Sequence, residues 1–71
     1  RVDNLKLRAR ALGMIAKIAG VDTAVAEMAL DSTGGSVKPA ILVAAGQKPA
    51  AAQTLLRKTE GNLRAALTRL E

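Results

Sequence analysis

Apolar side chains recur at helical spacing along residues 4–19, and they occupy two faces of the predicted helix. At 100° per residue, one stripe is formed by Leu5, Ala9, Leu12, Ala16 and Ala19. A second stripe, on another face, is formed by Leu7, Ala11, Met14 and Ile18. Because a bundle helix needs one apolar face, we expect the first stripe to pack against the rest of the chain. The second stripe should then contact another part of a longer parent chain or a second subunit.

The remainder of the sequence repeats itself with a period of 26 residues, as two units at 20–45 and 46–71. Identical residues recur at Ala19 and Ala45, Gly20 and Gly46, Ala24 and Ala50, Ala26 and Ala52, Leu30 and Leu56, Thr33 and Thr59, Gly35 and Gly61, and Ala40 and Ala66. Each unit reads as a helix, a turn and a second helix. Since two units are too few for an open solenoid, we expect them to pack on each other.

Glycine, proline and small polar residues divide the chain into five predicted helices. A left-handed residue that ends the first helix is predicted at Gly20, and the following helices are predicted to end at Gly34 and Gly35, at Gly46 and at Gly61. N-caps are predicted at Asp3 or Asn4, Asp22 or Thr23, Ser36 and Asn62. Pro39 and Pro49 fall in the first turns of their helices, where a missing N–H should do no harm. The predicted fold is a single all-α domain over residues 1–71, a compact five-helix bundle.

The composition excludes several classes of function. The chain contains no Cys, no His and no aromatic residue, so disulfides, thiolate metal sites, a histidine base and base-stacking platforms are all excluded. Its carboxylates are scattered near caps and turns, so we assign it no catalytic residue, metal or cofactor. The longest apolar run, residues 40–45, is far too short to cross a bilayer. The chain begins at Arg1, so we interpret it as a piece of a longer, cytoplasmic protein.

The net charge of +5 raises the possibility of an anionic partner. Basic residues of the leading helix form a narrow seam between its two apolar stripes, at Lys6, Arg10 and Lys17. A solvated helix face explains such a seam more simply than a nucleic-acid site does.

One stretch, Thr33 to Ile41 with the sequence TGGSVKPAI, has the chemistry of an anion site. Free N–H groups at a helix start, the Ser36 hydroxyl and the Lys38 ammonium could together bind a phosphate. The stretch is not a P-loop, because that loop's lysine motif and its preceding strand are absent. On these residues alone, helix capping and a solvated lysine remain the simpler interpretation.

The sequence resembles the C-terminal helical region of N-acetylmuramic acid 6-phosphate etherases, which are relatives of the glucokinase regulatory protein. The residues that carry the resemblance are LKLRARA at 5–11, AGV at 19–21, Ala26, Leu30, GGSVK at 34–38, Ala40, Ile41, Gly46 and GNLRAAL at 61–67. At two positions the chain departs from the family pattern: Ser36 replaces the usual Asn, and Pro39 replaces a helix-favouring residue.

The resemblance implies a role within a two-part, cofactor-free enzyme. In that family a sugar-isomerase-type α/β domain binds the phosphosugar and carries the catalytic carboxylates. The enzyme cleaves the lactyl ether to N-acetylglucosamine 6-phosphate and D-lactate in cytoplasmic cell-wall recycling, and it works as a homodimer. The helical region, with a fold like that of ubiquitin-associated domains, follows as a lid. The resemblance therefore makes Gly35, Ser36 and Lys38 candidate contacts of the phosphosugar, and Leu7, Ala11, Met14 and Ile18 candidate contacts of the parent domain or partner subunit.

An alternative interpretation is a free-standing interaction module of the ubiquitin-associated-like class. Such a module would bind a protein helix or, through its basic seam, RNA. The identity of any upstream domain would distinguish the two interpretations.

Overall fold

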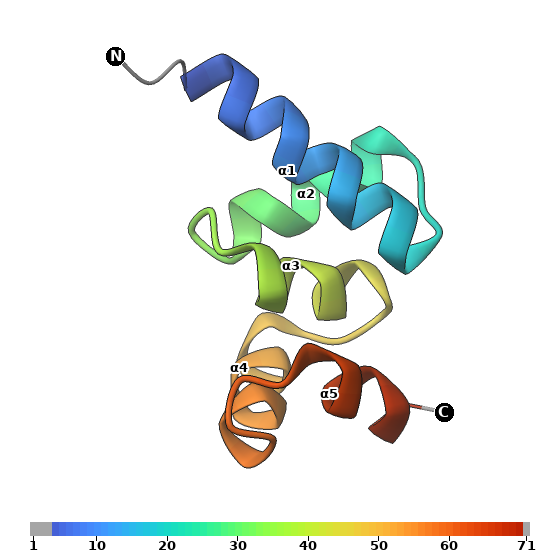
Figure 1. Ribbon diagram of the computed structural model, residues 1–71, viewed down its shortest axis with the longest axis vertical. Coiled ribbons are helices and arrows are strands. Elements are labelled where there is room, and N and C mark those ends of the chain that lie inside the picture. The colour runs from blue at the N-terminus through green and yellow to red at the C-terminus, as the bar shows by residue number, and fades with distance from the viewer. Residues whose placement is uncertain (1–3, 71) are drawn as a thin grey trace.

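Residues 4–70, the part of the chain that the computed structural model describes, fold into five α-helices joined by short turns (Figure 1). These helices are α1 (Asn4–Ala19), α2 (Thr23–Ser32), α3 (Val37–Ala44), α4 (Pro49–Lys58) and α5 (Leu63–Arg69). No strand occurs within the described range. The prediction of an all-α, five-helix bundle is confirmed.

Two of the predicted side-chain caps form, one at the start of α2 and one at the start of α5. The Val25 N–H donates to the Asp22 carboxylate at 2.9 Å, and the Ala65 N–H donates to the Asn62 side-chain oxygen at 3.0 Å. In both, the donor is the third residue of its helix, which is the usual partner of a capping side chain. Pro49 is the first residue of α4, as predicted. The cap predicted at Asp3 lies outside the described residues.

The prediction that Ser36 caps α3 through its side chain is wrong. Ser36 occupies the N-cap position, but its hydroxyl makes no capping hydrogen bond. The third residue of α3 is Pro39, which has no N–H to offer. The proline therefore removes the donor that the cap would have bonded, an effect that the sequence interpretation had treated as harmless.

Helix α3 lies at the centre of the molecule. Figure 1 shows it between α1 and α2 on one side and α4 and α5 on the other, and it contacts each of these four helices. Three consecutive residues, Ala40, Ile41 and Leu42, are fully buried. Consecutive residues point to different sides of a helix, so α3 is covered around much of its circumference.

The core consists of two clusters that meet along α3. The larger cluster contains Ile15, Ala26, Ala29, Leu30, Ala40 and Ile41. The smaller cluster contains Leu42, Ala52 and Ala66. Small alanines at the buried positions let the short helices approach closely, and leucines and valines at the edges of both clusters close the remaining space.

Helix α1 packs on the core by its C-terminal half. Ile15 is completely buried, and Leu12 and Ala16 pack beside it. Leu5 and Ala9, which we expected on the packed stripe, are exposed, Leu5 by 80%. Figure 1 shows the reason, since the start of α1 extends beyond the other helices. Within residues 4–70, no helix is both long and apolar enough to cross a membrane.

An ion-pair cluster ties the N-terminal half of α1 to α2. The Arg8 guanidinium lies 2.9 Å from a carboxylate oxygen of Asp31 and 3.6 Å from one of Glu27. The hydrogen bond to Asp31 and the two negative charges raise the pKa of Arg8 above its ordinary value. The three side chains are substantially exposed, so the cluster fixes the orientation of α1 more than it stabilises the fold.

Substitutions at Ile15 and Ile18 should distinguish the buried side of α1 from its half-exposed side by their effects on the free energy of unfolding. We expect Ile15→Ala to lower the free energy of unfolding by about 3 kcal/mol, because it leaves a cavity in the larger core cluster. Ile18→Ala, at a position 49% exposed on the same helix, should cost less than about 1 kcal/mol. Urea denaturation of the 71-residue chain measures both values, and equal losses would contradict this account of how α1 packs.

Candidate functional site

The turn between α2 and α3 is closed by a buried threonine. Thr33 Oγ1 lies 3.0 and 3.1 Å from the carbonyl oxygens of Ala29 and Leu30, and 3.1 Å from that of Ser36. The hydroxyl can donate to one of these at a time. The Gly35 N–H donates to the Leu30 carbonyl at 2.9 Å, which ends α2 and turns the chain toward α3.

The turn between α4 and α5 repeats this arrangement 26 residues later. Thr59 Oγ1 lies 2.9 and 3.3 Å from the carbonyl oxygens of Leu55 and Leu56, and the Gly61 N–H donates to Leu56 at 2.8 Å. Gly61 has a φ of 78°, in the left-handed region that favours glycine. The sequence repeat is therefore a repeat of hydrogen bonds, and the shared Thr and Gly residues carry it.

Lys38 joins these two turns. It is the second residue of α3, and its ammonium donates to the carbonyl oxygen of Gly61 at 2.8 Å. That carbonyl belongs to the turn that starts α5, so one side chain of the first unit holds the turn of the second. Lys38 thus has a structural function that its sequence position did not reveal, because the acceptor is a backbone atom 23 residues away.

The three candidate phosphosugar contacts lie together on the surface. Gly35, Ser36 and Lys38 are all exposed at the start of α3. Among residues 4–70 no carboxylate pairs with the Lys38 ammonium, and the hydrogen bond to Gly61 uses one of its three donors. The other two donors of the ammonium can face an anion that approaches this turn. The Ser36 hydroxyl can do so as well, because it makes no capping bond.

The candidate interface residues of α1 divide into two groups. Leu7, Met14 and Ile18 are between 49% and 52% exposed, and we call them the α1 apolar face. Ala11 instead packs against the larger core cluster. Ile18 also borders a shallow hollow of about 410 Å³, whose other lining residues are Leu63, Arg64, Leu67 and Thr68 of α5. The sequence did not lead us to expect this contribution from α5. The repeat was the available signal, because Leu63 and Leu67 correspond to Val37 and Ile41 of the first unit.

The described residues form no catalytic constellation. The chain has no His or Cys, and among residues 4–70 no three acidic side chains are grouped so that they could hold a metal ion. Within the same range every buried side-chain polar atom has a hydrogen-bond partner. The features that this surface does present are an exposed ammonium at one turn and an apolar face on α1.

Comparison with known proteins gives one consistent result. The chain is 44% identical over 70 residues to the N-acetylmuramic acid 6-phosphate etherase of Serratia proteamaculans, which is 97% of this chain and 24% of that enzyme. It is 45% identical over 69 residues to the enzyme of the same name from Streptomyces avermitilis, covering 94% of this chain and 22% of that enzyme. N-acetylmuramic acid 6-phosphate etherase 1 of Bacillus licheniformis is 36% identical over 69 residues, 96% of this chain and 23% of that protein.

The chain resembles the C-terminal segment of N-acetylmuramic acid 6-phosphate etherases. It spans about a quarter of the length of the etherases it matches. No protein-family model matches the chain, and no solved structure matches it. The resemblance noted from GGSVK and GNLRAAL is thus confirmed, and it extends over nearly all of this chain and only a minor part of each etherase.

The bond between Lys38 and Gly61 predicts a measurable difference between equivalent positions of the two units. Lys38→Met should lower the free energy of unfolding by about 1 kcal/mol, because it removes a charge-assisted hydrogen bond and keeps the aliphatic stem. Arg64→Met, at the matching position of the second unit, should change it by less than about 0.5 kcal/mol. Thermal unfolding followed by circular dichroism tests the pair, and an equal effect would refute the structural function of Lys38.

Proposed function

We propose that this chain is the noncatalytic C-terminal domain of an N-acetylmuramic acid 6-phosphate etherase, where it serves as a lid and as a dimer-packing element. The complete enzyme would cleave the lactyl ether of its substrate to N-acetylglucosamine 6-phosphate and D-lactate, in cytoplasmic recycling of the cell wall. Its partners would be a preceding sugar-isomerase-type domain, a second copy of the enzyme and the sugar phosphate. The proposal includes no cofactor and no binding to nucleic acid or to a membrane.

The observation that carries this proposal is the similarity of nearly the whole chain to one segment of proteins named as etherases. The chain itself offers no histidine or cysteine for catalysis. In this proposal the residues that act on the substrate belong to the remaining three quarters of the enzyme, and this segment contributes binding.

The α1 apolar face supports a packing function. Leu7 and Ile18 are separated by 11 positions, or about 16 Å along a helix, with Met14 between them. Each side chain keeps about half of its surface in water, and near Ile18 the face continues into the hollow against α5. A continuous apolar strip of this length on a small domain is typical of a surface that another domain covers.

The exposed ammonium of Lys38 supports a lid function. The bond to Gly61 holds it beside the start of α3, which lowers the side-chain freedom that binding would cost. If this surface closes over the sugar phosphate, Lys38 and the Ser36 hydroxyl are the groups that would meet the phosphate, beside Gly35.

A domain replacement tests the packing function. We would replace the matching segment of the Serratia proteamaculans etherase by this chain and introduce Met14→Glu into the hybrid enzyme. The change should lower kcat/KM by about tenfold or more, because a carboxylate on the α1 apolar face would be buried without a partner. Met28→Glu is the matched control, since Met28 is 72% exposed on α2 and away from this face. Equal kinetics of the two variants would refute the proposed interface.

The same hybrid enzyme tests the lid function of Lys38. Lys38→Met should raise KM by about tenfold, the effect of one lost charge-assisted contact to phosphate, while Lys48→Met, the same change at an exposed position that lines none of the described hollows, leaves KM unchanged. Circular dichroism at the assay temperature separates this effect from the loss of stability described above. An unchanged KM in a folded Lys38→Met enzyme would limit Lys38 to its structural function.

A further inference from the structure

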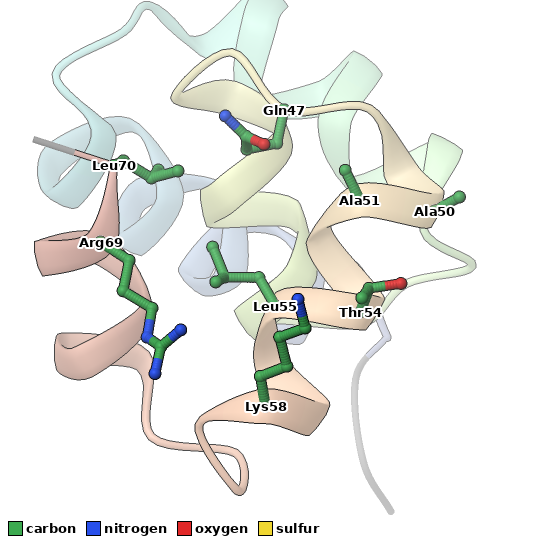
Figure 2. Close-up of a pocket in the computed structure, with 8 residues that line it drawn as sticks. All are labelled: Gln47, Ala50, Ala51, Thr54, Leu55, Lys58, Arg69 and Leu70. Atoms are coloured by element: carbon green, nitrogen blue, oxygen red, sulfur yellow. The ribbon is translucent and has the colours of Figure 1, made fainter.

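The internal repeat places a surface groove at equivalent positions of the two units. The first groove, of about 250 Å³, is lined by Val25, Met28, Ala29, Ser32, Val43, Ala44 and Pro49. The second groove, of about 400 Å³, is lined by Gln47, Ala50, Ala51, Thr54, Leu55, Lys58, Arg69 and Leu70 (Figure 2). Six lining positions of the first groove recur 26 residues later in the second, so both grooves lie between the two helices of a unit.

At the first groove the structure shows which segment lies against it. Pro49, the first residue of α4, lines this groove together with residues of α2 and α3. The helix that follows the first unit thus begins at the groove of that unit. Apart from the Ser32 hydroxyl, its lining side chains are apolar, which suits a proline at a helix start.

The second groove has a different charge. Lys58 stands where the first groove has Ser32, and Arg69 stands where it has Val43. Figure 2 shows the two cationic side chains on opposite sides of the groove, one from α4 and one from α5, with Leu55 between them. No carboxylate lines the groove, and within residues 4–70 neither cation is engaged in an ion pair.

Helix stabilisation alone does not account for both cations. Each lies in the last turn of its helix, where a positive charge is favourable. The last turns of α2 and α3 carry no basic residue, however, and these helices form the equivalent pair in the first unit. The second unit therefore has two cations that line the same groove, one from each of its helices, and this arrangement suits an anionic ligand.

We propose that the second groove binds the acidic first turn of an α-helix in a partner protein, placed against the groove as the start of α4 is placed against the first groove. Acidic residues are favoured in the first turn of a helix because the helix dipole is positive there. Carboxylates in such a turn would lie between Lys58 and Arg69, while a small apolar residue would contact Ala51, Leu55 and Leu70. This inference does not rest on the etherase function proposed above.

A peptide copied from α4 provides the probe. The test peptide has the sequence of residues 46–58 with Lys48→Asp and Ala50→Glu, and the unmodified peptide is its control. Titration of the ¹⁵N-labelled chain should shift the amide signals of the second-groove residues, with the acidic peptide binding about tenfold more tightly than the control. That ratio corresponds to the energy of about two exposed ion pairs.

Charge reversal makes the test specific to the groove. The double variant Lys58→Glu with Arg69→Glu should invert the preference, so that the unmodified, basic peptide binds better than the acidic one. Arg10→Glu with Arg64→Glu produces the same net charge at two exposed positions that line neither groove, and it should keep the original preference. Circular dichroism verifies that both variants fold.

Three outcomes would overturn the inference. They are the absence of shifts in the second groove at millimolar peptide, equal affinity for the two peptides, and an equal change of preference in the two double variants. The last result would mean that net charge, and not the groove, governs binding.

Discussion

Helix α3 is only eight residues long, and helices of that length are marginal in water unless tertiary packing supports them. Its support comes from burial on several sides at once, by α1 and α2 in one layer and by α4 and α5 in the other. Both core clusters include residues of α3, so the two layers are held together through this one helix. The buried alanines follow from the same constraint, because larger side chains would keep the short helices too far apart for α3 to contact all four of them.

The connection between the two units also depends on α3. Its second residue, Lys38, binds the Gly61 carbonyl in the turn of the second unit, while Pro39 deprives Ser36 of a capping partner. The start of α3 is thus less well capped than the starts of α2 and α5, yet it is the point where the units are tied together. The bond to Gly61 leaves two donors of the Lys38 ammonium unused. A ligand could bind these donors without disturbing the core, because the ammonium is exposed.

The surface offers three binding features that are spatially distinct. The α1 apolar face and the hollow beside it are suited to a covering domain, the Lys38 turn to an anion, and the second groove to an acidic helix start. The segment matches about a quarter of each related etherase, and the proposed function uses the first two of these features for contact with the rest of the enzyme and with its substrate. The two grooves lie at equivalent positions of the repeat, and Lys58 and Arg69 give the second one a positive charge that the first lacks.

By itself the sequence determined the all-α fold, the positions of the helices and the equivalence of the two turns, because glycine at left-handed positions, capping side chains and helical periodicity act locally. It also determined the resemblance to the etherases through residues of the two turns. Only the tertiary structure decided which residues of α1 are buried, that Lys38 bonds to Gly61, and that Lys58 and Arg69 share a groove. These depend on how helices distant in sequence are placed against one another: Leu5 follows the apolar period as well as Leu12 does, but it stays 80% exposed. Ser36 shows both kinds of information. Its N-cap position was predictable from the sequence, whereas the missing side-chain cap became clear only when the structure placed Pro39 as the third residue of α3.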